Sequence, residues 1–366
     1  MVIGKVQYLR GDYEAGERIF QQTVVTDRSI GHKSGEAFDL RFLANGRAVK
    51  GDLQGAKRFY EQALAIYREI DDRAHVAYTL TETAWVYKAG GQPMATLPIY
   101  NEALSLFRDM QDQQGVALVL DEKCNVSVTL GELEQGRQAC EEALGLFRKS
   151  GEKNLLTRTL SDLANIDSIE DKLEESRAMF NEALNMDRQS GDQGQAVWVT
   201  LGLAEVAMEE GHLEEAKHEV QDALNYLHQH ADSNDEINAQ SLLAEIALTE
   251  GNLVEAHRAL DAAGALLHTH QGWTARFIYT ITDARLETAD GKLSGARSSL
   301  ISVLNEAKKH NYVHYELEAR LALCEVEAKT NPASALAHEK VLEQEARQKQ
   351  FGMIARKAQA LANRIG

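Results

Sequence analysis

The histidines are the residues of this chain whose spacing comes nearest to metal chemistry. The triplets HQH at 228–230 and HTH at 268–270 lie 40 residues apart, and His310 continues the series. Imidazole is a common zinc ligand, but residues i and i+2 point about 200° apart on a helix, so one helix cannot chelate with both. A cationic residue near a helix C-terminus is favoured by the helix dipole. We prefer this simpler role and expect no metal site.

The motifs of common catalytic sites are missing from the sequence. There is no phosphate-binding G-x-x-x-x-G-K-[ST], no dinucleotide-binding G-x-G-x-x-G, no H-E-x-x-H and no G-x-S-x-G. Paired carboxylates such as Asp71 and Asp72 stand at expected turns, where helix capping explains them. We therefore expect no enzymatic activity and no cofactor.

Composition narrows the class of partner. The 39 basic and 56 acidic residues give a formal charge of -17, which opposes a general attraction to nucleic acid or anionic lipid. A hydrophobic content of 44% with only 3 prolines indicates a large helical core. No run of 18 or more apolar residues is present, so the sequence predicts no membrane span.

A repeat of 40 residues organises the elements that position these side chains. Helix-breaking residues recur at that interval without insertion or deletion: Gly11, Gly51, Gly91, Gly131, Asp171, Gly211, Gly251, Gly291 and Asn331. Five residues after most breaks stands a small residue, four later a larger apolar one, and three later an Ala, as in Ala56, Tyr60 and Ala63. Offsets of 0, +4 and +7 lie on one helical face, so two helices can approach closely around a bulky side chain.

Each repeat therefore reads as two helices joined by tight turns. A second small residue precedes each break by seven positions, as Ala44 and Ala84 do. Glycine suits the left-handed position after a helix, and Asp52 beside Gly51 can cap the next one. Pro98 falls inside a second helix, where we expect it to remove a helical hydrogen bond and bend that helix.

This pattern of a small residue on the first helix, Gly at the turn, and Ala, aromatic and Ala beyond it resembles the tetratricopeptide repeat (TPR). The usual unit has about 34 residues, and the longer unit here is similar to kinesin-light-chain-like and bacterial signalling arrays. The C-terminal sequence resembles the closing repeat of TPR regions in bacterial serine/threonine kinases and winged-helix regulators. The resemblance implies an all-α, right-handed superhelical solenoid of about eight to nine repeats. It places a continuous array over residues 1–350, with a partial first repeat over 1–30, and a capping helix over 351–366.

In TPR proteins, groove-facing side chains stand 13, 10, 6 and 3 residues before the turn. In the N-terminal half, these positions carry aromatic, amide and basic side chains that suit a peptide. Asn amides pair with an extended backbone, and Trp and Arg often dominate interface energy. The alternative is that some of them pack between helices or face solvent. The predicted partner-binding residues are Phe38, Arg41, Asn45, Tyr78, Thr81, Trp85, Asn125, Arg158, Asn165 and Trp198.

The C-terminal half has a different lining at the position six residues before the turn. Glu205, Glu245 and Glu325 occupy it, and Arg285 interrupts the series. An acidic lining would favour a basic ligand segment, and a solvated helix face is the alternative.

The resemblance implies a non-catalytic protein interaction module that binds a peptide or partner protein in its concave groove. Its expected setting is a signalling protein of the bacterial cytoplasm. The alternative is the small-molecule sensor domain of a transcription regulator or kinase, with Tyr78, Trp85 and Trp198 stacking on the ligand.

Self-association is a third hypothesis. The chain begins within a first helix, as if cut from the middle of a longer array, and Val2, Val6 and Leu9 would then be uncovered.

Overall fold

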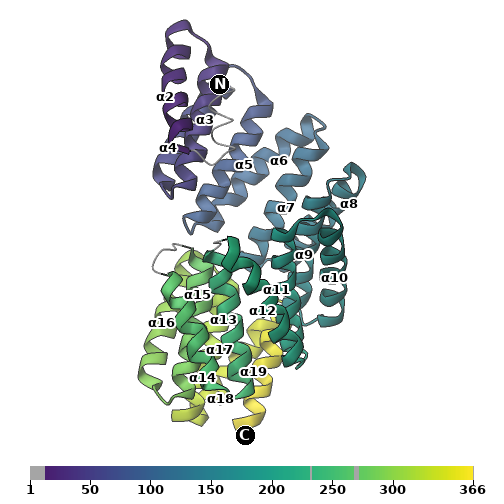
Figure 1. The fold of residues 1–366 in the computed structure, drawn as a ribbon, viewed down its shortest axis with the longest axis vertical. Helices are drawn as coiled ribbons and strands as arrows, with labels where there is room; N and C mark the ends of the chain where they lie inside the picture. The colour runs from purple at the N-terminus through teal and green to yellow at the C-terminus, as the bar shows by residue number, and fades with distance from the viewer. Residues whose placement is uncertain (1–12, 231–232, 268–271, 366) are drawn as a thin grey trace. The chain divides into compact units, whose positions relative to one another are not determined.

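The computed structural model describes residues 13–230, 233–267 and 272–365, in which every regular element is a helix (Figure 1). The chain divides into two compact units, residues 1–126 (unit 1) and 127–366 (unit 2). The helices up to the division are α2 (Tyr13–Ile30), α3 (Lys33–Val49), α4 (Leu53–Glu69), α5 (Arg73–Ala89), the short 3-10 helix η1 (Pro93–Ala95), α6 (Thr96–Asp109) and α7 (Gln113–Leu130).

The helices of the second unit follow in the same alternation of first and second helices. They are α8 (Leu133–Ser150), α9 (Lys153–Ile169), α10 (Leu173–Ser190), α11 (Gln193–Glu209), α12 (Leu213–His230), α13 (Ser233–Glu250), α14 (Leu253–Leu267), α15 (Trp273–Ala289), α16 (Leu293–His310), α17 (Val313–Thr330), α18 (Pro332–Gln348) and α19 (Gly352–Ile365). These helices confirm the predicted all-α repeat solenoid. None in the described part of the chain is long and apolar enough to cross a membrane.

The predicted turns from residue 51 onward lie where the repeat places them, and Gly11 lies outside the described residues. The turn glycines have positive φ, for example 79° at Gly51 and 83° at Gly211, and Asp171 takes the same left-handed conformation with φ 69°. The Asp52 carboxylate caps α4 by accepting a hydrogen bond from the backbone N–H of Gly55. Asn331 differs, because its φ is -147° and it caps α18 ahead of Pro332.

The small residues bring paired helices close together. Ala44 of α3 packs with Ala56 and Tyr60 of α4 in one core cluster, and none of the three is more than 2% exposed. Ser176 takes the small position in α10, and its hydroxyl donates a 2.8 Å hydrogen bond to the carbonyl of Ala164 on α9. A backbone carbonyl within reach of so short a side chain shows how closely these helices approach.

Pro98 does not remove a helical hydrogen bond, so the physical basis of that prediction is wrong. The η1 turn precedes α6, which begins at Thr96, so Pro98 lies in the first turn of the helix. Backbone N–H groups in a first turn have no partner within the helix. Proline is therefore tolerated there.

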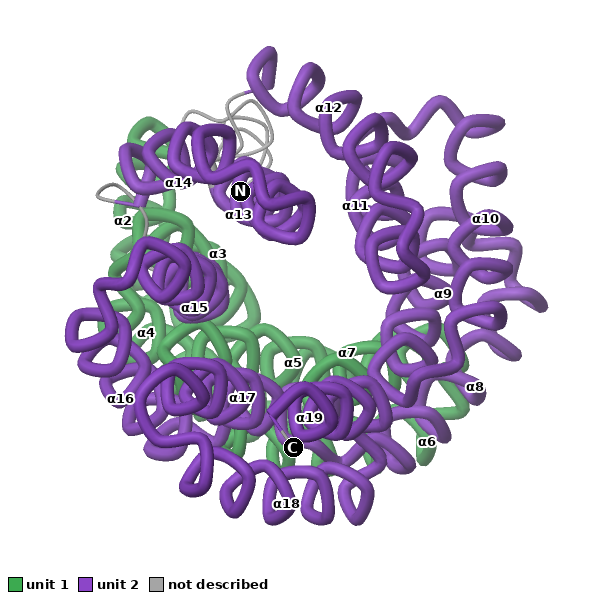
Figure 2. Tube along the Cα trace, turned by 90° about the horizontal axis from the view of Figure 1, so that it is seen from below, with its two compact units in different colours: residues 1–126 green, residues 127–366 purple. Residues whose placement is uncertain are grey.

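The helices of unit 2 form an inner and an outer series (Figure 2). The inner series is α9, α11, α13, α15, α17 and α19, and each member contacts the next. The last member, α19, also contacts α9, so the inner series closes on itself. Whether the chain is a single array over residues 1–350 with a cap from 351 stays a prediction.

Candidate partner-binding surface

Phe38 and Arg41, two of the predicted residues on α3, form an aromatic and cationic group in unit 1. The Arg41 guanidinium lies 5.9 Å from the ring centre of Phe38 and 5.6 Å from that of Phe42. It also lies 3.7 Å from the carboxylate of Glu82 on α5. Cation–π and ionic contacts therefore hold Arg41 in place between the two helices.

Asn45, the third predicted residue on α3, is partly used inside the fold. The Tyr60 hydroxyl donates a hydrogen bond to its Oδ1. The Asn45 side chain also hydrogen-bonds Glu82, whose pKa is raised by burial in spite of Arg41 and Asn45. Less of this amide remains for an extended peptide than the sequence pattern suggested.

The three predicted residues of α5 differ in their surroundings. The Tyr78 ring packs edge-on against Phe107 with 4.9 Å between ring centres, and its hydroxyl donates to Asp112 at 3.3 Å. The Thr81 hydroxyl donates to the backbone carbonyl one turn earlier. Trp85, by contrast, is 43% exposed. Only Trp85 of the three offers a large free surface.

Trp85 belongs to a group that we call the α5–α7 patch, consisting of the exposed Trp85 and Asn125 and the half-buried Lys88 and Glu122. Lys88 follows Trp85 by three residues, so both lie on one face of α5. Lys88 Nζ lies 2.9 Å from the Glu122 carboxylate and donates to Asn125 Oδ1 at 3.4 Å. Asn125 is exposed. The patch joins an aromatic surface to an amide and an ion pair, a combination that suits peptide binding.

The remaining predicted residues lie in unit 2. Arg158 of α9 is half-buried, and Asn165 of the same helix is exposed. Trp198 of α11 is 53% exposed. Glu205 is exposed and follows Trp198 by seven residues, so the two side chains share one face of α11.

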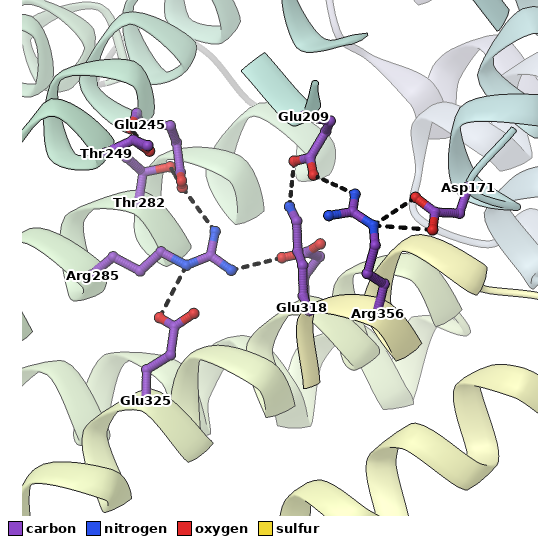
Figure 3. Close-up of polar contacts among 10 residues, drawn as sticks. Asp171, Glu209, Glu245, Thr249, Thr282, Arg285, Glu318, Glu325 and Arg356 are labelled. Atoms are coloured by element: carbon purple, nitrogen blue, oxygen red, sulfur yellow. Dashed lines mark hydrogen bonds and ion pairs between the residues drawn. The ribbon is translucent and has the colours of Figure 1, made fainter. Parts of the chain in front are cut away.

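An ionic network joins the inner helices α13, α15 and α17 of unit 2 (Figure 3). Arg285 of α15 lies 2.9 Å from Glu245, 2.9 Å from Glu318 and 3.3 Å from Glu325. The Thr282 hydroxyl donates a 2.9 Å hydrogen bond to Glu245. The acidic lining expected from the sequence is thus partly neutralised from within the chain.

Glu318 is a member of this network that the sequence reasoning missed. It stands 13 residues before the break at Asn331, which is the register of Phe38 and Trp198. Applying the repeat to the C-terminal half at that position would have identified it. Burial opposes ionisation of Glu318, but Arg285 and Lys357 outweigh burial and lower its pKa to about 2.

The neighbouring carboxyls behave differently. Burial raises the pKa of Glu325 in spite of Arg285. The side chain of Glu205 is open to solvent on one side, yet surrounding protein limits its hydration and, with the nearby Glu209, raises its pKa to about 7. These groups belong to a cluster of charged side chains on the inner helices of unit 2 and the turn after α9, in which carboxyls outnumber basic groups. The carboxyls are Asp171, Glu205, Glu209, Glu245, Glu318 and Glu325, and the basic groups are Arg285, Arg356 and Lys357.

The described histidines of the predicted series make two kinds of contact. His228 Nε2 lies 2.9 Å from the Glu236 carboxylate, and the other two pack against aromatic rings. His310 lies 4.4 Å from the ring centre of Trp273, and His230 stacks on Tyr226 at 3.9 Å. No group of three or more His, Cys, Asp and Glu side chains within residues 13–230, 233–267 and 272–365 is arranged to hold a metal ion. The triplet at 268–270 lies outside the described residues, as do Val2, Val6 and Leu9.

Comparison with protein families identifies a TPR region. The model of the MalT-like TPR region matches residues 101–362, which is well over half of the chain. No curated protein matches the sequence.

Several solved structures share the fold. The Rap conjugation gene regulator of the plasmid pLS20, in complex with the Phr* peptide, is 15% identical with a TM-score of 0.60, over 84% of this chain and 78% of that one. The apo form of RapI is 14% identical with a TM-score of 0.60, over 79% and 98%. A TPR protein from Parabacteroides merdae is 16% identical with a TM-score of 0.54, over 76% and 95%. At these identities the likeness shows the fold alone.

Proposed function

Because the chain belongs to the family of MalT-like TPR regions, we propose that it is a non-catalytic regulatory module that binds a peptide segment of a partner protein. The binding surfaces in this proposal are the α5–α7 patch of unit 1 and the Trp198 face of α11 in unit 2. Repeat proteins of stacked helix pairs use such extended inner surfaces for recognition.

The exposure of Trp85 and Trp198 is the observation that carries the proposal. The chain has 3 tryptophans, and these two are 43% and 53% exposed. The third, Trp273, packs on Phe277 and His310. Exposing so much aromatic surface to water is unfavourable, and tryptophan is enriched among the residues that dominate interface energies. Both side chains also stand in the register that faces the groove in related arrays.

The structural neighbours support a peptide as the partner. One of them, the Rap regulator of pLS20, was solved with the Phr* peptide bound, and it shares this fold. We further propose a place in bacterial signalling, in the cytoplasm, from the same likeness to bacterial regulators.

A small-molecule sensor is the second candidate, and Trp198 with Glu205 favours it. An aromatic face and a carboxyl two turns apart on α11 could hold a small ligand that stacks and carries a hydrogen-bond donor. A metabolite at 100 times its dissociation constant would stabilise the fold by about 2.7 kcal/mol. Thermal-shift screening of a metabolite panel therefore tests this candidate.

The peptide proposal is tested by selecting peptides on the full chain from a random library. We expect selected peptides to lose at least about tenfold in affinity on Trp85→Ala or Trp198→Ala, because truncating a central tryptophan costs about 2 kcal/mol. Val254 is 82% exposed on the outer helix α14, so Val254→Ala is the matched control and should change nothing. Selected peptides that bind both tryptophan variants as well as the wild type would contradict the proposal.

A further inference from the structure

The C-terminal helix α19 returns to the beginning of unit 2. A Cβ atom on Gly352 would lie 2.3 Å from the backbone carbonyl oxygen of Glu170, at the end of α9. A Cβ atom on Gly131 would lie 2.7 Å from Val313, at the start of α17, and 3.4 Å from Phe351. Both glycines therefore allow a contact between segments that lie about half the chain apart.

The two sides of α19 make different kinds of contact. Ile354, Ala355 and Ala358 are buried, and the helix packs against α17 and α18. Arg356 instead reaches the acidic side chains at the ends of α9 and α11 (Figure 3). Lys357 reaches the same Glu209 at the end of α11. Apolar contacts thus attach α19 to its neighbours in sequence, and ionic contacts attach it to the start of the unit.

We call these ionic contacts the clasp, which consists of Asp171, Glu209, Arg356 and Lys357. Arg356 Nε lies 2.8 Å from Asp171, and its Nη2 lies 3.0 Å from Glu209. Lys357 Nζ lies 2.5 Å from the other oxygen of Glu209. Glu209 receives both basic groups and is the centre of the clasp.

The basic side chains of the clasp are more exposed than its central carboxylate. The Arg356 side chain is 43% exposed and Lys357 is 28% exposed, whereas Glu209 is only 8% exposed. Ion pairs with exposed partners are weak and are screened by salt. A carboxylate that is itself poorly exposed still needs a cation when the pair opens.

Other carboxyls near the clasp also favour a neighbouring cation. Lys357 also interacts electrostatically with Glu318, and Glu205 lies close to both Glu209 and Lys357. If Arg356 and Lys357 left, Asp171 and Glu209 would lose the basic side chains that contact them in the clasp.

We propose that α19 acts as a built-in ligand that closes the inner series of unit 2, and that a partner segment with an adjacent Arg–Lys pair on a small-residue helix competes for Asp171 and Glu209. The sequence of α19 itself, GMIARKAQALANRI, gives the chemistry of that segment: a short amphipathic helix with an apolar face of Ile and Ala and two consecutive basic residues. A helix of this length is marginal alone in water, so such a segment would fold on binding.

This inference rests on the proposed binding function and names a partner chemistry for unit 2. The two can fail separately. Loss of peptide binding on Trp85→Ala tests unit 1, where the clasp has no residue. The experiment below changes only the clasp.

The test uses the full chain and a fluorescein-labelled peptide with the sequence of residues 352–365. The variant Arg356→Glu/Lys357→Glu places four acidic side chains in the clasp and should open it. By fluorescence anisotropy we expect this variant to bind the peptide at least about tenfold more tightly than the wild type, because its own α19 no longer competes. Binding should weaken as salt is raised.

Matched variants separate this effect from general charge. Lys349→Glu/Arg364→Glu makes the same change of charge at two exposed positions outside the clasp, one just before α19 and one in its last turn, and should leave peptide binding at the wild-type level. Adding Asp171→Lys/Glu209→Lys to the opened variant restores opposite charges and should return binding to the wild-type level. Arg356→Gln/Lys357→Gln opens the clasp without adding negative charge, and it should also bind the peptide more tightly than the wild type. This variant tests the proposal if circular dichroism shows that Arg356→Glu/Lys357→Glu is unfolded. Equal affinity of the wild type and the folded clasp variants for the peptide, or no binding to any of them, would overturn the proposal.

Discussion

Arg285 and Glu318 form a 2.9 Å ion pair between the neighbouring inner helices α15 and α17. Both side chains are largely withdrawn from solvent, with exposed fractions of 16% and 11%. The same guanidinium reaches Glu245 on α13 and Glu325 on α17, so a single cation serves three carboxylates from adjacent repeats. Arg285 therefore ties together three successive inner helices of unit 2.

Replacing this cation should be costly. We expect Arg285→Met to lower the free energy of unfolding by about 3–5 kcal/mol, because it removes the cation shared by three poorly hydrated carboxylates. Urea denaturation followed by circular dichroism measures the loss. The exposed Arg297 of the outer helix α16 gives the control Arg297→Met, which should change stability by no more than about 0.5 kcal/mol. Similar losses in both variants would show that the network does not hold unit 2 together.

Glu318 should make unit 2 sensitive to acid. Its pKa is lowered from 4.5 to about 2 in the folded chain, so its contribution is present above pH 4.5 and is lost as pH falls toward 2. We expect Glu318→Gln to lose less stability than the wild type over this interval, by on the order of 3 kcal/mol. Denaturant titrations at a series of pH values test this, and parallel profiles for the two proteins would contradict it.

Glu205 should make unit 2 less stable at high pH, which is the opposite of the effect of Glu318. Its pKa is raised from 4.5 to about 7, so the stability it contributes is complete below pH 4.5 and is lost as pH rises through 7. We expect Glu205→Gln to melt at a higher temperature than the wild type at pH 8 and at the same temperature at pH 4. The exposed Glu214 of α12 supplies the control Glu214→Gln, which should follow the wild type at both pH values.

Replacement by alanine should change the stability of the chain in opposite directions at two helix glycines. Gly352→Ala places a methyl group against the Glu170 carbonyl, and we expect it to lower stability and separate α19 from α9. Gly145 of α8 has open space around the position of a Cβ atom, so Gly145→Ala should stabilise the chain by about 0.5–1 kcal/mol through helix propensity. Thermal melting compares the two, and a stabilising Gly352→Ala would show that the close approach is not rigid.

The fold could be predicted from the sequence because its signal is repeated. A single small residue such as Ala56 does not identify a helix face. A small residue at the same distance from the turn in successive repeats does identify it, and Gly51 or Gly211 identifies the turn. Pro98 shows the limit of this reasoning. The repeat predicted where the second helix lies, but not that η1 would delay its start and place Pro98 in a first turn.

The candidate site could be predicted only in part. The register identified Trp85 and Trp198, which are exposed, but it also identified Asn45 and Tyr78, which are bonded within the fold. The position of a residue in the repeat shows which face of the helix carries it. The hydrogen bonds of Asn45 and Tyr78, by contrast, depend on which side chains the neighbouring helices bring close to that face. The approach of Gly352 to Glu170 could not be predicted, since the repeat gives contacts between neighbouring units and says nothing of contacts between distant ones.

Hydrogen–deuterium exchange of the full chain, with and without a library-selected peptide, tests the central claim most directly. We predict slower amide exchange on binding in α5 and α7 around Trp85 and Asn125, or in α11 around Trp198, with no change in the outer helices α14 and α16. Protection confined to the outer helices, or no protection in any inner helix, would contradict binding through the inner faces.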